Sequence, residues 1–170
     1  MNSSRYEIRV YGIGVESFVT ARVSATSYSG ATSAGFGKNF NYISGANSQN
    51  VHIPMTAPVV TRTLDEKNWL VSFFTPQSIY PTLASVPIPT DSSVSIEAFP
   101  LSTFAVIEFG GEAGESDYKI ASNLLKDALA QDNITLADAG DVWSEAWCGY
   151  DAPNDIFHRH NEAWVKIVLG

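Results

Sequence analysis

One order of predicted elements, strand–strand–helix–strand–strand, occurs twice along this sequence of 170 residues. Strands are predicted where large apolar residues alternate with polar ones, and helices where apolar residues recur every three or four positions. In chain order the predicted elements are strands at 6–11 and 18–25, a helix around 36–43, strands at 56–63, 69–75, 94–99 and 103–109, a helix at 116–131, and strands at 142–150 and 163–169. We therefore expect two pseudo-repeats, at about 5–76 and 93–169, within one domain that spans 1–170.

Two such units favour an α+β fold in which both repeats contribute strands to a distorted antiparallel β-barrel flanked by two α-helices. In each unit the second strand is expected to return beside the first, because Gly12 and Gly14 in one repeat and Pro100 in the other break the chain between them. A cleft near the pseudo-twofold axis between the repeats would suit a small-molecule ligand.

The composition restricts the partners. The formal net charge is −8, with only ten lysine and arginine residues, and nucleic acids and anionic membranes both require clustered basic residues. The uncharged stretch at 68–90 contains four prolines and is not expected to cross a membrane as a helix. The single cysteine, Cys148, cannot form an internal disulfide. With no apolar leader at its start, the chain is expected to be a soluble, cytoplasmic protein, although a leader removed earlier would leave no trace here.

The most specific pattern lies at 35–59. It comprises Gly35-Phe36, then Tyr42-Ile43-Ser44-Gly45-Ala46-Asn47, then Ile53-Pro54-Met55-Thr56-Ala57-Pro58-Val59. This pattern resembles the SOUL family of haem-binding proteins. Further matches are Tyr6-Glu7-Ile8-Arg9, Phe109-Gly110-Gly111, Gly149-Tyr150-Asp151 and Asn161-Glu162-x-Trp164, so the resemblance spans nearly the whole chain. It implies the barrel fold also found in effector-binding domains of bacterial regulators, and binding of haem or a related porphyrin.

Haem binding requires an apolar surface, cations for the two propionates and, optionally, a ligand for the iron. The resemblance implies a cleft between one face of the first helix and a loop near 154–159. The candidates are Phe36, Phe40, Ile43, Met55 and Phe157 for the apolar surface, Lys38 and Arg159 for the propionates, and His52, His158 and His160 for the iron. Each has a plainer alternative, as a core residue, a solvated charge or an uninvolved histidine. Some SOUL proteins carry a histidine, proposed to ligate haem, where this sequence has Val10, so a ligand from that position is excluded.

Little in the sequence indicates catalysis, because it has no Gly-x-Ser-x-Gly elbow, no phosphate-binding glycine loop and no His-Glu-x-x-His. Glu162 is the one carboxylate of interest: facing a barrel cavity, it could hold a cationic ligand or act as a general base, and facing outward it would do neither. We expect a haem or tetrapyrrole carrier, buffer or sensor that is not an enzyme. The alternatives are a hydrolase or tetrapyrrole-modifying enzyme on the same scaffold, and a protein-interaction module that uses an exposed helix face.

Overall fold

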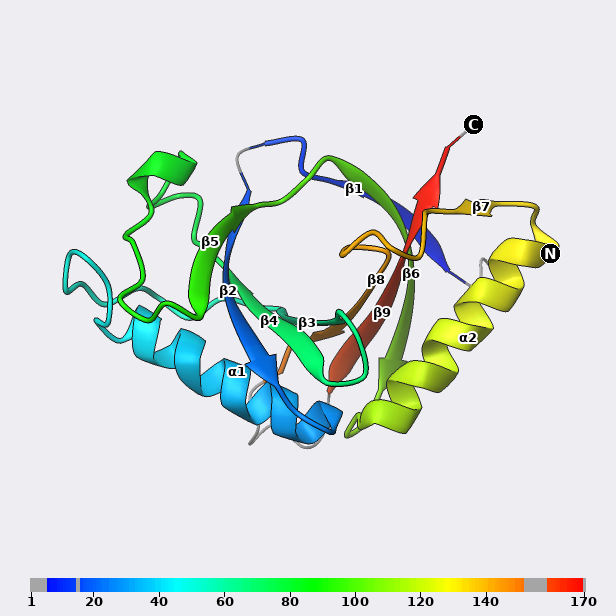
Figure 1. Cartoon of the computed structure of the whole chain (residues 1–170). Helices are drawn as coiled ribbons and strands as arrows, with labels where there is room; N and C mark the ends of the chain where they lie inside the picture. Colours follow the sequence, from blue (N-terminus) through cyan, green and yellow to red (C-terminus); the bar gives the residue numbers. More distant parts are fainter. Residues whose placement is uncertain (1–5, 15, 152–158, 170) are drawn as a thin grey trace.

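The computed structural model of the chain describes residues 6–14, 16–151 and 159–169. One antiparallel sheet curls into a half-barrel, and two helices cover its outer face (Figure 1). The elements are β1 (Glu7–Tyr11), β2 (Ser17–Ser24), α1 (Tyr28–Ile43), β3 (Val59–Thr63), β4 (Asn68–Phe74), a 3₁₀ turn (Leu83–Ser85), β5 (Val94–Ala98), β6 (Ser102–Gly110), α2 (Glu115–Gln131), β7 (Thr135–Leu136), β8 (Glu145–Gly149) and β9 (His160–Val168). The expected α+β class with two flanking helices is confirmed, and the barrel is open because β1 and β5 are the two ends of the strand order.

The strand order is β1-β6-β9-β8-β3-β4-β2-β5, with β7 added beside β9. The expectation that the first two strands of each repeat would pair is wrong. Arg9 of β1 lies opposite Phe104 of β6, and Ile96 of β5 lies opposite Val19 of β2. The order is symmetric about the β3–β8 pair, where Val60 faces Cys148. Each repeat therefore gives its opening strand to the other repeat.

The connections between these strands explain the exchange. Gly12 turns the chain after β1 with a φ of +78°, and a Cβ on it would lie 2.5 Å from the carbonyl oxygen of Pro100. Close by, the Phe99 amide donates to the Glu16 carbonyl. The β1–β2 and β5–β6 connections thus pack directly against each other, and each carries its chain across to the other half of the sheet.

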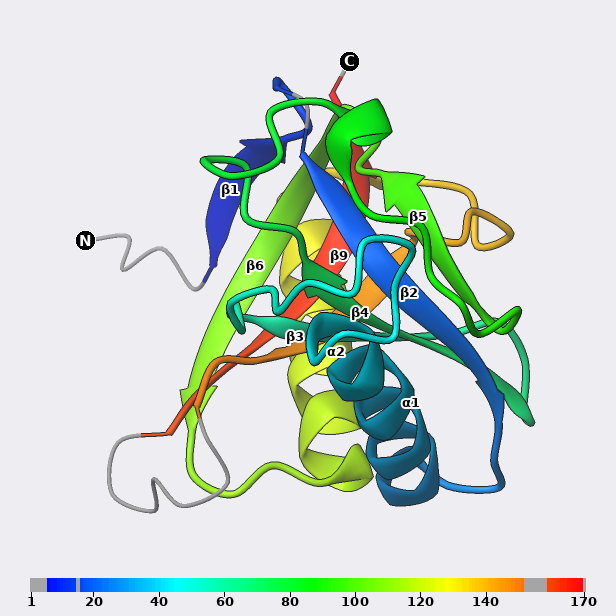
Figure 2. The ribbon, with the colours of Figure 1, turned by 90° about the vertical axis from the view of Figure 1, so that its left-hand side faces the viewer.

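Both helices lie on the same side of the sheet, as the view turned by 90° shows (Figure 2). Helix α1 packs on β2 and β4, and α2 packs on β6 and β9. The glycines that weaken the first helix by propensity are partly explained by packing, because a Cβ on Gly35 would lie 2.4 Å from a methyl of Val71. Ser27 starts the helix by accepting a hydrogen bond from the Gly30 amide. Close approach of α1 to β4 therefore requires a glycine at position 35.

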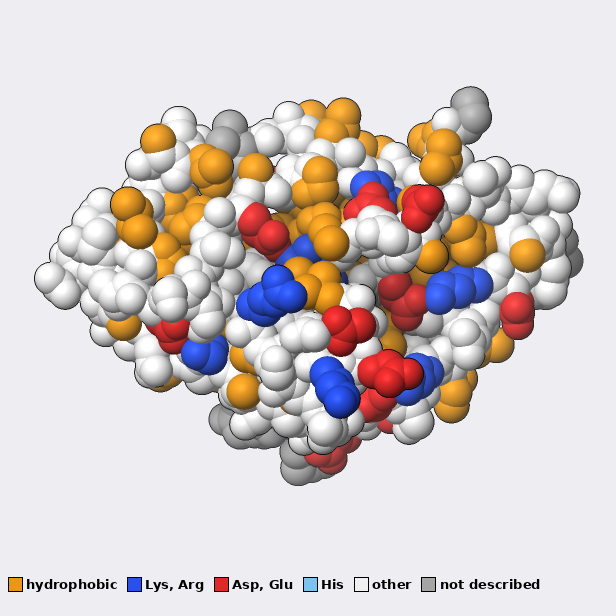
Figure 3. Space-filling model, in the orientation of Figure 1, with side chains coloured by type: hydrophobic (Ala, Val, Ile, Leu, Met, Phe, Trp, Pro, Cys, Tyr) orange, Lys and Arg blue, Asp and Glu red, His pale blue; other side chains and the backbone are white. Residues whose placement is uncertain are grey.

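The inner face of the curled sheet is filled mainly by aromatic side chains. Phe18, Phe104 and Trp164 come from the strands, and Trp143 enters from the 137–144 connection between β7 and β8. At the surface, acidic and basic side chains gather around the β3–β4 turn and the neighbouring side of α2 (Figure 3). The inner face and the α1 surface are the parts of the molecule described below as candidate sites.

Candidate functional site

The segment that follows α1 is fixed to the end of the helix by Asn47, which is 1% exposed. Its Nδ2 donates to the carbonyls of Tyr42 and Val51 at 2.9 and 2.8 Å, and its Oδ1 accepts the Val51 amide at 3.3 Å. The Ile53 amide then donates to the Ile43 carbonyl at 2.7 Å. The motif residues from Tyr42 to Ile53 thus bring the next segment of chain back beside the helix.

A pair of aromatic rings occupies one flank of α1. The rings of Phe36 and Phe40 are near-parallel, 13° apart with centroids at 5.9 Å, and Phe36 also meets the ring of Phe73 edge-on at 5.1 Å. Phe40 is 49% exposed and Met55 is 45% exposed, whereas Ile43 is 4% exposed within the core. Of the four apolar candidates that the structure describes, Phe36, Phe40 and Met55 reach the surface, and Ile43 supports it from below.

Lys38 is not brought to the aromatic pair. It lies two residues from both Phe36 and Phe40, about 200° around a helix of 3.6 residues per turn. On that opposite flank its Nζ donates to Asp91 at 3.0 Å and to Ser93 at 2.7 Å. Hydrogen bonds from Ser93, together with the Lys38 ammonium, lower the pKa of Asp91 to about 2. Lys38 therefore holds the loop before β5 against α1.

The remaining candidates are dispersed. Phe157 and His158 lie outside the described residues. Arg159 is half-buried at the start of β9, and His52 is exposed in the segment that folds back beside α1. Val59 pairs with Gly149, so the chain leaves β8 beside the run that follows Met55. The structure thus brings residues 56–58 and the described residues after β8, Tyr150 and Asp151, to the same end of the β3–β8 pair.

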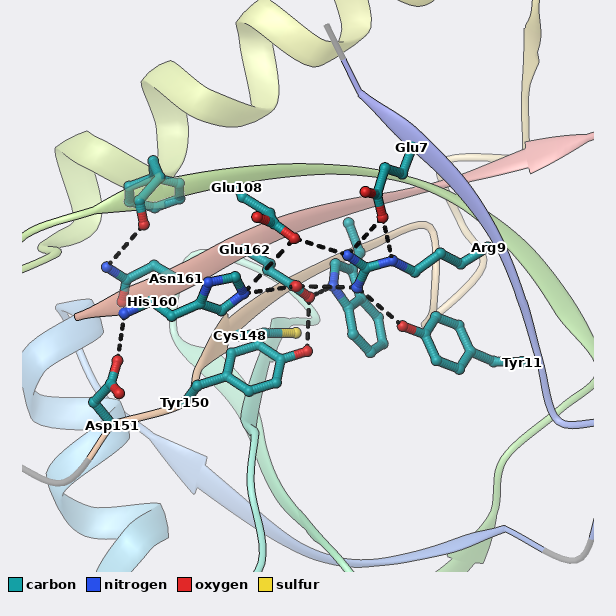
Figure 4. A network of polar contacts seen from close by, with 12 residues as sticks. Glu7, Arg9, Tyr11, Glu108, Cys148, Tyr150, Asp151, His160, Asn161 and Glu162 are labelled. Carbon is teal, nitrogen blue, oxygen red and sulfur yellow. Dashed lines mark hydrogen bonds and ion pairs between the residues drawn. The ribbon is translucent and has the colours of Figure 1, made fainter. Parts of the chain in front are cut away.

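His160 lies on the inner face of the sheet, where it contacts Glu162 (Figure 4). Glu162 is 2% exposed. One carboxylate oxygen accepts from Arg9 Nη1 at 3.0 Å and lies 2.8 Å from His160 Nε2; the other accepts from the Tyr150 hydroxyl and the Trp164 indole N–H, both at 2.7 Å. Four groups, from strands β1 and β9 and from the loop after β8, therefore converge on a single buried carboxylate.

Hydrogen bonding decides the ionisation of Glu162. Burial opposes the charged form, but the hydrogen bonds from His160, Tyr150, Trp164 and Arg9 outweigh it, so the pKa of Glu162 lies below its ordinary value. A carboxylate held in this way is a weak base at neutral pH, and all its strong acceptor positions are used. The arrangement fits an internal anion that positions its neighbours better than it fits a general base.

Arg9 connects this carboxylate to two others. Its Nη2 donates to Glu108 at 3.0 Å, its Nε donates to Glu7 at 3.0 Å, and its Nη1 also reaches the Tyr11 hydroxyl at 3.3 Å. One ligand atom each from Glu108, His160 and Glu162 lies within 4.8 Å of the other two, a spacing that a metal ion could bridge. Arg9 already pairs with both of these glutamates, so its single positive charge offsets part of the negative charge that a metal ion would otherwise balance.

Cys148 lies against this network and is fully buried. Burial, followed by the nearby Glu162 charge, raises the pKa of the Cys148 thiol well above its ordinary value. A neutral, inaccessible thiol is a poor nucleophile. In this environment Cys148 acts as a small buried apolar residue.

The sequence alone indicates no role for Arg9, Tyr11 or Tyr150. Arg9 and Tyr150 stand in the motifs that carry the family resemblance, and period-two alternation places Glu7, Arg9 and Tyr11 on one strand face. That signal predicts a polar stripe. The alternation does not predict that Glu162 is the partner of this stripe. Arg9 reaches Glu162 only because β1 pairs with β6 and β6 pairs with β9.

Comparison with known proteins agrees with the fold and the motifs. The family described as SOUL heme-binding protein matches residues 1–166. This chain belongs to the SOUL family. The SOUL protein described here is 32% identical to mouse heme-binding protein 2, over 94% of this chain and 77% of that protein. It is 29% identical to heme-binding protein 1 of Xenopus laevis, over 94% of this chain and 82% of that protein.

The fold of this SOUL protein also occurs outside the family. The C-terminal domain of EcmrR superposes with a TM-score of 0.70 at 12% identity, covering 97% of this chain and 99% of that one. Likeness at that identity concerns the fold. Among the described helices of the SOUL protein, neither α1 nor α2 has the length and apolar character needed to cross a membrane. Family membership indicates a binding role for the chain.

Proposed function

We propose that this protein binds haem, or a related porphyrin, on the exposed flank of α1 and does not turn it over. The observation that carries the proposal is the near-parallel Phe36–Phe40 pair at the surface of a SOUL-family chain. Two stacked rings with one half-exposed member offer a flat apolar face, and a porphyrin is a flat, largely apolar ligand. Met55, on the segment folded back beside the helix, extends the same kind of surface.

The propionates of the ligand would be held by a positively charged side chain. Arg159 is our candidate for a propionate, because its planar guanidinium can bind a carboxylate through two donors. Phe157 and His158, which precede it outside the described residues, remain candidates on the same segment. Lys38, whose side chain lies on the other flank of α1 from the aromatic pair, is a weaker candidate for this role.

Among the described histidines, we favour His52 as the iron ligand. It is exposed in the segment that Asn47 and Ile53 hold against the end of α1. The His160 ring lies on the inner face of the sheet with its Nε2 bonded to Glu162, so ligation through that nitrogen would have to break the contact. When bound, haem would supply an iron centre open to axial ligation; the chain would supply a binding surface and charge.

The absence of turnover is part of the proposal. The one carboxylate with a possible role as a base, Glu162, is saturated with hydrogen-bond donors and has a lowered pKa. The protein is proposed to act in the cytoplasm as a carrier, buffer or sensor, and its net charge of −8 supports a role without nucleic-acid partners. A hydrolase on the same scaffold would lose product formation in Glu162→Gln while the fold survived, and this result would contradict our proposal.

A haemin titration followed across the Soret band tests the site. We expect saturable binding near one haem per chain, and at least a tenfold loss of affinity in Phe40→Asp, about 1.4 kcal/mol. The matched control is Ile120→Asp on α2, since Ile120 is 58% exposed and Phe40 is 49% exposed. Equal losses in both variants would show that haemin associates with any apolar patch, and would overturn the assignment to α1.

The iron ligand is tested separately with His52→Ala, His158→Ala and His160→Ala. A sharp Soret band that disappears only in His52→Ala would support the assignment. Loss in His160→Ala or His158→Ala alone would move the iron to the β8–β9 side. A spectrum indifferent to all three changes would mean that haem is held without an axial histidine.

A further inference from the structure

β1 forms one free edge of the sheet, as the turned view shows (Figure 2). Among the described strands it pairs with β6 alone, so the backbone N–H and C=O groups along its other edge are not part of a ladder. The corresponding strand of the second repeat, β5, forms the opposite edge of the sheet. The two edge strands differ in how they are protected from pairing with another chain.

The outer face of β1 is apolar and exposed. Ile8 lies opposite Ala105 of β6, which belongs to the core cluster beneath α2, so Ile8 is on the helix side of the sheet. Side chains alternate along a strand, and Val10 therefore shares this face. Ile8 and Val10 are each 48% exposed, although α2 covers the neighbouring strands β6 and β9.

The same position in β5 is covered. Ile96 is the counterpart of Ile8, because it lies opposite Val19 of β2 as Ile8 lies opposite Ala105 of β6. Ile96 is partly buried, and it packs against the core cluster beneath α1 together with Tyr80 from the β4–β5 connection. The first of these edges therefore exposes a residue that the second covers with its own chain.

The usual protections of an edge strand are weak on this face. Natural edge strands avoid pairing through charged side chains, proline or a covering segment. The charged residues of β1, Glu7 and Arg9, face inward, where Arg9 is bonded to Glu108 and Glu162 (Figure 4). The outward residues of β1 carry no charge, and the strand contains no proline.

Apolar side chains continue from β1 into the neighbouring connections. Ile13, two residues after the strand, is 80% exposed, and Leu101, which directly precedes β6, is 69% exposed. The two connections are in contact, because a Cβ on Gly12 would lie 2.7 Å from the Leu101 amide nitrogen. With Ile8 and Val10, these residues give this edge an apolar surface, and exposed apolar surfaces are typical of protein contacts.

The sequence of β1 is complementary to its own reverse. In an antiparallel pair of two copies with Ile8 opposite Ile8, Glu7 of one copy lies opposite Arg9 of the other, and the reverse pair occurs as well. Tyr6 then lies opposite Val10. Opposite charges directly across an antiparallel pair stabilise it, and like charges destabilise it. A register with Ile8 opposite Val10 would bring the two Arg9 side chains together. Charge complementarity therefore favours a second copy of this chain, with Ile8 on the twofold axis.

We propose that β1 is the interface of a homodimer in which the β1 strands of two copies pair antiparallel about a twofold axis at Ile8. The pairing joins the two sheets edge to edge and brings the outward apolar residues of both copies together. An interface of one short strand per copy fits a weak, reversible dimer. Dimerisation does not depend on haem binding, because the Phe36–Phe40 flank belongs to α1, which packs on β2 and β4.

Sedimentation equilibrium of the haem-free protein tests the dimer. We expect a monomer–dimer equilibrium with a Kd of about 10–100 μM. Ile8→Lys should weaken it at least about tenfold, because two ammonium groups would face each other across the axis. The matched control is Ile120→Lys, at a position of α2 that is 58% exposed, and it should keep the parent Kd. Circular dichroism would show that both variants are folded.

Cysteine cross-linking tests the register. Ile8→Cys should form a disulfide-linked dimer on mild oxidation, because directly opposite residues have Cβ atoms about 4.5–5.5 Å apart. Val10→Cys should cross-link about tenfold more slowly, since Val10 faces Tyr6 and not its own copy. Cys148 is fully buried and should not contribute.

Three results would each overturn the proposal. The first is a parent protein that stays monomeric up to about 1 mM. The second is a dimer that Ile8→Lys leaves intact or that Ile120→Lys weakens equally. The third is equal cross-linking of Ile8→Cys and Val10→Cys.

Discussion

Replacing Glu162 with glutamine should lower the free energy of unfolding by about 2 kcal/mol at neutral pH. The change removes a charge that accepts four hydrogen bonds in a position that is 2% exposed. Charge-assisted hydrogen bonds contribute about 1.5–3 kcal/mol each, and the relief of burying a charge offsets part of their loss. For a chain of this size, 2 kcal/mol corresponds to a fall in Tm of about 4–8 °C.

The magnitude depends on how the amide can be placed. A glutamine has one acceptor oxygen, and the Trp164 indole N–H can only donate. Trp164 is 1% exposed and cannot move away, so the new oxygen must remain on the side of Tyr150 and Trp164. The new NH₂ group then faces Arg9, which also only donates. Arg9 is partly exposed and can turn to Glu7 and Glu108, which limits the loss.

The effect should depend on pH with a defined sign. The folded-state pKa of Glu162 is lowered, so its carboxylate stabilises the protein above the unfolded-state pKa of about 4.3, and this stability is lost as the pH falls through the folded-state value. The difference between the parent protein and Glu162→Gln should therefore be largest near neutral pH and shrink as the pH is lowered toward about 3.

Urea unfolding followed by tryptophan fluorescence measures this difference directly. The control is Glu108→Gln, which removes another Arg9 partner from a side chain that is 50% exposed and should cost less than about 0.5 kcal/mol. The reasoning would be refuted by a Glu162→Gln variant as stable as the parent protein at neutral pH, by a difference that grows on acidification, or by an equal loss in the control.

Three further changes test other parts of the structure. Gly35→Ala should destabilise the protein by about 1–2 kcal/mol, because overpacking against Val71 exceeds the gain in helix propensity; chemical denaturation would show it, and a stabilised variant would contradict it. Asn47→Ala should cost about 2–3 kcal/mol by freeing buried backbone groups at the end of α1, with faster amide exchange confined to the following segment. Lys38→Ala should leave haemin affinity within about twofold, because the side chain bonds to Asp91 and Ser93 on the other flank of α1; a tenfold loss would place the propionates there.

Local patterns in the sequence predicted most of the secondary structure. The apolar stripe of Ile120, Leu124, Leu125 and Leu129 predicts a helix at 116–131, within one residue of α2. The start of α1 was missed because Gly30 and Gly35 lower helix propensity, and only contact with Val71 explains a glycine there. The strand pairing was wrong for a related reason. Neighbouring strands usually pair, and nothing within a strand records that its partner belongs to the other repeat.

In the candidate sites, too, local patterns predicted some residues, and others depend on which strands pair. Phe36, Phe40, Ile43 and Met55 were predicted together as an apolar surface; in the structure Phe40 and Met55 are exposed, Phe36 is half-buried and Ile43 lies in the core. The network around Glu162 could not be predicted, because Arg9 is brought to it across two strand ladders.

The exchange of opening strands has a consequence for how the chain is made. While the ribosome is still synthesising the second half of the chain, β1 has no β6 to pair with, β2 lacks its β5 neighbour and β3 lacks β8, so three strands of the first half emerge without a second-half partner. The partner of β2 is complete at residue 98, that of β1 at residue 110 and that of β3 only at residue 149, so the last of these edges stays open until residue 149 has left the exit tunnel. Folding is therefore mainly post-translational, and a nascent chain arrested before that point is the species most exposed to aggregation and most in need of a chaperone.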